Sequence, residues 1–280
     1  MRFDTKMPAP NAVAASSTTT FRLPIGRRYH SLLLIGTATT FAVADISEIR
    51  VLANEKVIQR FSGTDREVMN LFDGRDTAAV SAARFELVIP FDRYGLLTRA
   101  AEEETALNTG SVGADGRAIK SLTLEVDLGA GLTGTPALTL YATQSEAVPG
   151  GPGSVPYIQL STRDYAAADT YDISDLPRGG VNTQFLDKLF LKPSTSTLDN
   201  FEVLANSVKV FERTAVVNER AQRDGIRVPQ AGYYVIDRTE HGYGGDPLDL
   251  RGLDDFRVKL ATGAALTTRV LAQYIGGLSD

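Results

Sequence analysis

Short runs of alternating apolar and polar residues dominate this chain. From Leu122 to Leu128 every second residue is apolar, which is the period of a strand buried on one face. Comparable runs rich in Val, Ile, Leu, Phe and Tyr occupy residues 21–36, 48–61, 83–91, 137–144, 157–164, 186–193, 201–213, 232–238, 255–261 and 268–277. Gly, Pro, Asn and Asp separate the runs and supply the turns. Regularly spaced strands with little helix predict an all-β sandwich or barrel.

One helix is well signalled between the strands, within residues 62–75. Thr64 is followed three residues later by Glu67, which is the spacing of a capping box. Asp73-Gly74 is expected to end the helix, because Gly takes the left-handed conformation without strain. A weaker helix is expected within residues 214–225, and it also ends in Asp-Gly.

The tetrapeptide Val-Leu-Ala-Asn occurs twice, at residues 51–54 and 203–206. In both places an LPxG sequence precedes it, and a helix, Asp-Gly, a Val-Ile strand and a pair of closing strands, expected as a hairpin, follow it. A preserved order of several matches indicates a duplicated domain. We therefore expect Leu52 to be equivalent to Leu204, and Val126 to Val258.

The duplication sets the expected domain boundaries. The most Pro/Gly-rich segment, residues 145–156, predicts the linker, with a first domain at 19–148 and a second at 149–280. Residues 1–18 have no apolar signal-peptide core and are rich in Ala, Pro, Ser and Thr, so they predict a flexible N-terminal arm. Residues 101–116 have no counterpart in the second copy, and we expect them to project as an extra loop that faces outward or contacts another subunit.

Composition excludes several classes of protein. The 280 residues are 43% hydrophobic and 22% charged, with a net charge of −5, and no basic block is available to neutralise phosphates. The chain has no cysteine, so disulfides and thiolate metal sites are excluded. The longest apolar stretch, residues 31–44, is too short and too interrupted for a membrane span.

Candidate catalytic motifs are weak. Gly129 to Gly134 match G-x-G-x-x-G, but Pro136 and β-branched residues follow where a nucleotide site needs a helix, so a hairpin loop is expected. His30 lies in a predicted strand, where we expect a structural role without the partners of a catalytic triad. His241 lies in a glycine-rich loop and is expected at the surface or at a subunit contact. Two isolated histidines do not predict a zinc site, and we expect no catalytic or cofactor-binding residue and no enzyme activity.

Two groups of acidic residues remain. Residues 101–105, Ala-Glu-Glu-Glu-Thr, are expected to form a solvated loop face, with a subunit contact as the alternative. Carboxylate oxygens of the second group could bind calcium between subunits, although no EF-hand spacing is present and no ligand is assigned; this group is Asp115, Asp246, Asp249, Asp254 and Asp255.

Residues 20–95 carry a resemblance to a known family. The sequences FRLPIGRRYHSLLLIG, ISEIRVLANEKVIQRFSGTDREVMNLFDGR and FELVIPF resemble the N-terminal half of the double jelly-roll major capsid protein of the corticovirus type. These proteins coat tailless icosahedral bacteriophages that have an internal membrane. Asn54-Glu55-Lys56 stands where many relatives have Asn-Gly-Lys, and in the second half the resemblance depends on the duplication.

The resemblance implies two tandem eight-stranded jelly rolls with short helices in loops. It also implies a pseudo-hexagonal homotrimer in a virion capsid, assembled in the bacterial cytoplasm. The implied partners are neighbouring trimers, penton or spike proteins, membrane-associated virion proteins and an internal lipid membrane, without sequence-specific nucleic-acid binding. Ca²⁺ is the one implied structural ion, and no cofactor is required.

Two alternatives have the same coarse pattern. A carbohydrate-binding or adhesin-like duplicated β-sandwich would need exposed aromatic residues, and the absence of tryptophan counts mildly against it. A cupin-like enzyme is also a duplicated β fold, but it needs clustered metal-binding histidines.

Overall fold

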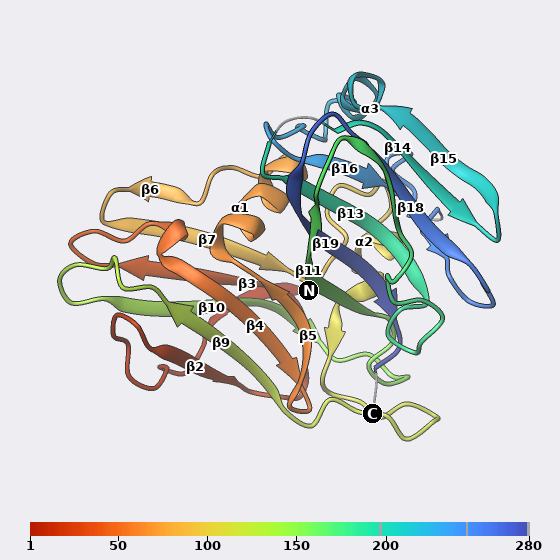
Figure 1. The fold of residues 1–280 in the computed structure, drawn as a ribbon. Helices are drawn as coiled ribbons and strands as arrows, with labels where there is room; N and C mark the ends of the chain where they lie inside the picture. The colour runs from red at the N-terminus through yellow and green to blue at the C-terminus, as the bar shows by residue number, and fades with distance from the viewer. Residues whose placement is uncertain (196–197, 245, 279–280) are drawn as a thin grey trace. The chain divides into compact units, whose positions relative to one another are not determined.

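The computed structural model describes residues 1–195, 198–244 and 246–278. The chain divides into two compact units (Figure 1). The first is Met1–Pro156 together with the chain end from Gly277, and the second is Tyr157–Gly276. The division falls after Pro156, the last residue of the Pro/Gly-rich segment in which a linker was expected.

The first unit contains two antiparallel sheets. In one sheet the order is β1 (Arg2–Lys6), β10 (Ala137–Glu146), β3 (Arg27–Thr37), β7 (Arg84–Pro90) and β6 (Ala79–Ser81), with β8 (Leu107–Asn108) beside β3. The other has the order β5 (Lys56–Phe61), β4 (Ile46–Ala53), β9 (Leu122–Leu128) and β2 (Thr18–Leu23). Every second residue of β9 is buried, as the alternation predicted, so the core lies between the two sheets.

The second unit repeats this arrangement. One sheet has the order β11 (Val155–Tyr165), β19 (Leu266–Gly276), β13 (Phe185–Pro193) and β16 (Tyr234–Asp237), with β17 (Leu248–Asp249) beside β13. The other has the order β12 (Asp169–Ile173), β18 (Phe256–Thr262), β14 (Leu198–Ala205) and β15 (Val208–Thr214). Every strand of the second unit has a counterpart in the first unit, which has β6 in addition, and this correspondence confirms two tandem jelly rolls.

The main helices follow equivalent strands in the two units. They are α1 (Gly63–Phe72) after β5 and α3 (Ala215–Gln222) after β15, and the short helical turns η1 (Val43–Asp45), α2 (Arg99–Glu102) and η2 (Glu103–Thr105) belong to the first unit. Among the described residues, no helix is long and apolar enough to cross a membrane.

The predicted capping box of the first helix was placed two residues too close to the C-terminus. Ser62 is the N-cap: its Oγ accepts a hydrogen bond from the Asp65 backbone N–H at 3.1 Å, and Asp65 Oδ2 accepts one from the Ser62 backbone N–H at 3.2 Å. The helix begins this early because β5 ends at Phe61 and the chain turns immediately. In α3 the equivalent N-cap is Thr214, whose hydroxyl accepts from the Val217 N–H.

The repeated Val-Leu-Ala-Asn sequence forms the same turn in both units. Asn54 and Asn206 begin two-residue hairpins in the left-handed region, with φ of 53° and 48°, which Asn tolerates better than most residues. The ladder also slips at the same place, between the Val and the Leu of the repeat. The predicted equivalence of Leu52 and Leu204 is therefore confirmed.

The second predicted equivalence was wrong by two residues. Val51 lies opposite Leu124, and Val203 lies opposite Val258. Leu124, and not Val126, is therefore the counterpart of Val258. Because the side-chain period of a strand is two, both valines face the core, and the pattern alone does not separate the two registers.

The closing strands do not form the expected hairpins. β9 pairs with β2 and β4, whereas β10 pairs with β1 and β3, so the segment between β9 and β10 crosses from one sheet to the other. Gly129 to Gly134 lie in this crossing, where the Gly129 N–H donates to the Asp45 carbonyl at 2.7 Å. The segment is a loop, as expected, but it is not a hairpin loop.

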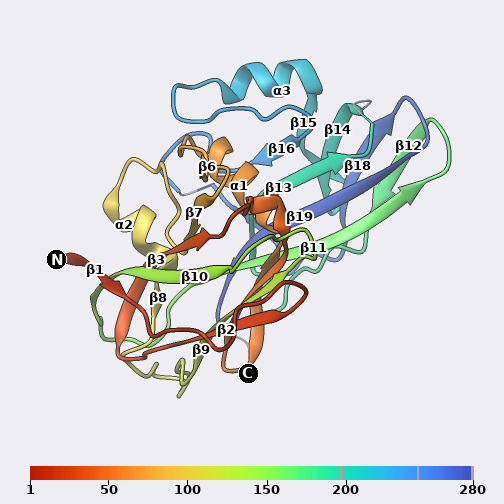
Figure 2. The same ribbon diagram turned by 90° about the vertical axis from the view of Figure 1, so that its left-hand side faces the viewer.

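The N-terminal segment is part of the fold, which corrects the prediction of a flexible arm over residues 1–18. Residues 2–6 pair with β10 as strand β1 (Figure 2), and the buried Met7 donates its N–H to the Leu140 carbonyl at 2.8 Å. β1 is the counterpart of β11, since each pairs with the last strand of its jelly roll. The polar composition of residues 2–6 hides this role, because an edge strand needs few apolar side chains.

Candidate functional site

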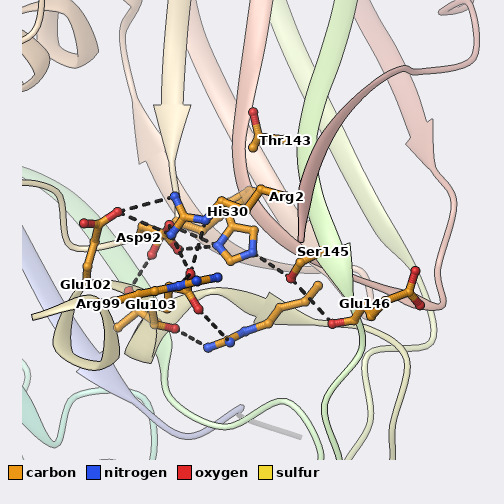
Figure 3. Close-up of polar contacts among 12 residues, drawn as sticks. Arg2, His30, Asp92, Arg99, Glu102, Glu103, Thr143, Ser145 and Glu146 are labelled. Atoms are coloured by element: carbon orange, nitrogen blue, oxygen red, sulfur yellow. Dashed lines mark hydrogen bonds and ion pairs between the residues drawn. The ribbon is translucent and has the colours of Figure 1, made fainter.

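A buried histidine belongs to a cluster of polar side chains in the first unit. His30 is on β3 and is 2% exposed. Its Nδ1 lies 3.0 Å from Asp92 Oδ2, and its Nε2 lies 2.8 Å from Ser145 Oγ on β10 (Figure 3). The expectation that His30 lacks triad-like partners was wrong, since residues distant in sequence supply both.

The connectivity Ser–His–Asp is that of a catalytic triad, but its setting differs. Ser145 lies within β10, opposite Arg2 on one side and Arg28 on the other. A triad serine needs nearby N–H donors that are free to bind an oxyanion, and the N–H groups of a strand paired on both sides are used in the ladder. The geometry of His30 therefore fits a hydrogen-bonded link between β3, β10 and the segment that holds Asp92.

Charged side chains extend this cluster to the N-terminus. One terminal nitrogen of Arg2 lies 2.9 Å from Asp92 Oδ2 and 2.8 Å from Glu103 Oε1, and Arg99 Nε donates to the same Glu103 oxygen at 2.7 Å. Partial burial acts to raise the pKa of Glu103, but the hydrogen bonds from Arg99 and Arg2 outweigh it and lower the pKa below its ordinary value. The cluster fastens β1 to the segment that carries α2 and η2.

This segment contradicts two expectations. The sequence 101–105 was expected to be a solvated loop face, yet the Glu103 side chain is 13% exposed and Thr105 is fully buried. Residues 101–116 were expected to project, yet Leu107 pairs with Tyr29 on β3 and the Asn108 side-chain amide donates to the Val148 carbonyl at 2.7 Å. The insertion folds back onto its own unit, and only its part from 110 to 116 lies largely at the surface.

The candidate calcium ligands do not form a metal-binding cluster in the part of the chain that the structure describes. Asp249, Asp255 and Asp115 each pair with the arginine two residues later, and the hydrogen bond from Arg251 lowers the pKa of Asp249 to about 2. Among the residues that the structure describes, no three His, Asp or Glu side chains gather where they could hold a metal ion. A calcium ion between subunits therefore stays a prediction.

The second histidine, His241, lies at the surface, which was one of the two positions expected for it. The side chain of His241 is 73% exposed, and its Nε2 lies 3.9 Å from Asp246 Oδ2. This distance is too long for a hydrogen bond.

The two jelly rolls, with a structural rather than a catalytic polar cluster, define a duplicated jelly-roll protein. Family models identify it further: the viral coat protein P2 N-terminal domain matches residues 4–145, and the P2 C-terminal domain matches residues 155–278. The chain belongs to the viral coat protein P2 family. The resemblance found in residues 20–95 is thereby confirmed and extends through the second half.

Solved structures show the same fold. The major capsid protein P2 of bacteriophage PM2 superposes with a TM-score of 0.85 at 18% identity, covering 100% of this chain and 99% of that one. A chain of the Sulfolobus turreted icosahedral virus gives 0.70 at 12% identity, covering 98% and 90%. The Faustovirus major capsid protein gives 0.63 at 10% identity, covering 99% and 90%. A search of curated proteins finds no match.

Sequence reasoning missed Arg2, Asp92 and Ser145 as partners of the His30 cluster. Asp92 and Ser145 are separated from His30 by 62 and 115 positions, so no local spacing relates them. The duplication was the one signal available for the N-terminal strand, because the second copy begins with a strand before its LPxG sequence.

Proposed function

We propose that the chain is the major capsid protein of a tailless icosahedral bacteriophage and forms pseudo-hexagonal homotrimers that tile a shell over an internal membrane. The observation that carries this proposal is the duplication itself. Two jelly rolls with the same strand order, turn and helix give each chain two similar building blocks, so three chains supply six. Membership in the coat protein family supports the same assignment.

The proposed partners follow from this assignment. Each trimer would contact neighbouring trimers, with penton or spike proteins at the vertices and membrane-associated virion proteins beneath. The chain would be located in the virion capsid after assembly in the host cytoplasm. Its net charge of −5 supports contacts with proteins more than direct binding of the genome.

A carbohydrate-binding sandwich is the less supported alternative. Such a site needs aromatic side chains grouped on one exposed surface. The exposed tyrosines Tyr94 and Tyr243 belong to different units, at 39% and 66% exposure. The described residues therefore give no observation that favours this function.

Measuring the mass of the purified protein in solution tests the proposal. Light scattering across a wide concentration range is expected to give a particle of three times the 30.1 kDa chain mass. Electron microscopy of the particles should then show pseudo-hexagonal outlines. A 30 kDa monomer at every concentration would count against the capsid assignment.

A further inference from the structure

The second unit exposes valines on two consecutive elements. Val208 and Val210 on β15 are 64% and 38% exposed, and Val216 and Val217 on α3 are 78% and 55% exposed. We call these four residues the valine surface. β15 is the last strand of its sheet in the second unit, and α3 packs against it (Figure 1). Apolar side chains on an edge strand and an adjoining helix are typical of a contact with another chain.

Two of the four equivalent positions in the first unit are buried, and the other two, Lys56 and Thr64, are exposed and half-buried. Counted from the N-caps Ser62 and Thr214, Val217 corresponds to Asp65, which is fully buried. Counted from the repeated turns, Val210 corresponds to Ile58, which is 2% exposed. At Val217 and Asp65 the apolar residue stands in the open copy and the polar residue in the buried one, which is the reverse of what solvent exposure favours, whereas Val210 and Ile58 are both apolar.

The sheet that contains β13 in the second unit and β3 in the first shows the opposite difference in exposure. Here the side chains of the second unit are buried and those of the first unit are not. In the second unit Phe190 lies opposite Leu271 on one side and Val235 on the other, and the three are 0%, 1% and 2% exposed. In the first unit Leu33 lies opposite Tyr141 and Val88 in the same way, yet these residues are only half-buried.

A shared hydrogen bond fixes this correspondence. The Asn70 side-chain amide of α1 donates to the Val88 carbonyl, and the Gln222 amide of α3 donates to the Val235 carbonyl, at 2.8 and 2.6 Å. In the first unit this half-buried face lines a hollow, which we call the β3 hollow. Six of its lining residues are polar or charged, and the other four are Leu33, Ile35, Val88 and Tyr141.

We propose that the valine surface of one chain docks on the β3 hollow of a second copy. This inference rests on the proposed homotrimer. A closed ring of identical chains needs two different, complementary surfaces on each chain. Each unit leaves one such surface open. The positions that are open in one unit and buried in the other are Val210 and Val217 on the valine surface, and Leu33, Val88 and Tyr141 in the β3 hollow.

Charge also favours a protein partner over a polyanion. On the valine surface Lys209 lies 3.2 Å from a carboxylate oxygen of Glu202 and 2.9 Å from one of Glu212. At the rim of the β3 hollow, Arg84 pairs with Glu86. Two further charged residues line the hollow, and both have partners inside the chain: Asp4 accepts a hydrogen bond from Thr143, and Arg75 lies over the Tyr94 ring. The apolar side chains of both surfaces are therefore available for the contact.

Single cysteines test the pairing directly, because the chain has none of its own. V217C and L33C chains with different tags are assembled alone and together, then treated with a bismaleimide. We expect cross-linked dimers in the mixture and none in either variant alone. Cross-linking of V217C with itself would overturn the proposal, as would an intact trimer without cross-links in the mixture. A mixture of V217C and V112C is the control pair.

A charge placed on either surface gives a second readout. V217E and L33E are each expected to raise the chain concentration at which half of the protein is trimeric, by about tenfold or more. V112E, at a position 64% exposed in the first unit, should leave it unchanged, and thermal unfolding checks that each variant is folded. Trimers of V217E as stable as the parent would overturn this interface and leave the capsid assignment standing. A parent chain that never forms trimers would overturn the proposed function itself.

Discussion

The first strands of the two units show how the same role is filled by different means. β11 has 11 residues and β1 has 5, yet each pairs with the last strand of its jelly roll. The shorter strand is additionally held by Arg2, whose guanidinium contacts Asp92 and Glu103. Glu103 belongs to the insertion that the second unit lacks. The comparison indicates that the insertion compensates for a short edge strand by adding charged contacts to it.

The arginines that follow the helices extend the comparison. Arg75 lies over the Tyr94 ring, 3.9 Å from its centroid, and burial lowers its pKa. Arg227 follows the equivalent Asp-Gly, but it is buried and pairs with the fully buried Asp237 and with Asp224 at the surface. Burial acts to lower the pKa of Arg227, and the two carboxylates outweigh it and raise the pKa. The second unit therefore depends on a buried ion pair where the first has a stacked arginine.

Removing the buried carboxylate gives the largest expected effect. Asp237→Ala leaves Arg227 buried without its main partner, and we expect the free energy of unfolding of the second unit to fall by about 3–5 kcal/mol. Tyr94→Ala, the matched change in the first unit, should cost about 1–2 kcal/mol. Denaturant unfolding of both variants measures the difference. Equal losses would show that the two arginines contribute alike.

The pH dependence of this pair has a defined sign. Burial acts to raise the pKa of Asp237, but Lys188 and Arg227 outweigh it, and the pKa lies below its ordinary value. A carboxylate with a lowered pKa stabilises the fold above its unfolded pKa, and the stabilisation is lost as pH falls through the folded value. Asp237→Ala should therefore flatten the acid limb of the stability profile of the second unit.

The repeated turns should respond equally. Asn54 Oδ1 accepts the Lys120 N–H at 2.7 Å, and Asn206 Oδ1 accepts the Asp254 N–H at 2.9 Å. Asn54→Ala and Asn206→Ala each lose these bonds and add strain at a left-handed residue, so each should cost about 1–3 kcal/mol. The Asn→Gly variants keep the turn conformation and isolate the side-chain bonds. Unequal costs, measured by denaturant unfolding, would mean that two turns with the same sequence contribute differently to the free energy of unfolding.

This turn illustrates what the sequence predicted well. A repeated tetrapeptide led to the equivalence of β4 with β14 because its Asn has a conformational role that few other residues can fill. The strand runs and the two helices were also recovered, since each depends on the spacing of nearby residues. The capping box was misplaced because Ser62 and Thr64 both begin an acceptable pattern.

Other features depend on contacts between residues distant in sequence. β1 was read as a flexible arm because the residues that hold Arg2 lie about a hundred positions away. Asp92 and Ser145 were missed for the same reason, and the insertion was expected to project because its polar residues conceal the buried stretch from Thr105 to Thr109. Val126 was misaligned because a two-residue slip keeps every apolar side chain on the same face.

Removing the ion pairs of Arg2 should destabilise the first strand, β1, and leave the other strands unaffected. Arg2→Ala removes the ion pairs with Asp92 and Glu103, and we expect the opening of β1 to become easier by about 1 kcal/mol. Hydrogen exchange of the amides in residues 2–6 measures it, with β11 as the internal reference. Because the pKa of Glu103 is lowered, its stabilising effect is lost as pH falls, so the protection factors of β1 in the parent protein, corrected for the intrinsic exchange rate, should fall in acid. Arg84→Ala, which breaks an exposed pair, is the control and should leave β1 unchanged.

The smallest expected effect concerns a cross-strand charge pair whose sign is reversed between the units. Arg50 lies opposite Glu125, and at the equivalent place Glu202 lies opposite Lys259. Arg50 contacts three carboxylates, those of Glu48, Glu125 and Asp127, at 2.6–2.9 Å. Glu202 accepts from Lys209, which keeps a second partner.

Arg50→Ala therefore leaves several like charges facing one another and should cost about 0.5–1 kcal/mol, whereas Glu202→Ala should cost only a few tenths, roughly 0.2 kcal/mol. Urea unfolding at low and at high salt measures both, and added salt should reduce the first difference because these side chains are partly exposed. A salt-independent loss for Arg50→Ala would indicate that the stem of Arg50 stabilises the sheet by packing and that its charge does not. In that case the reversed signs are two equivalent ways to cover the outer face of a jelly roll.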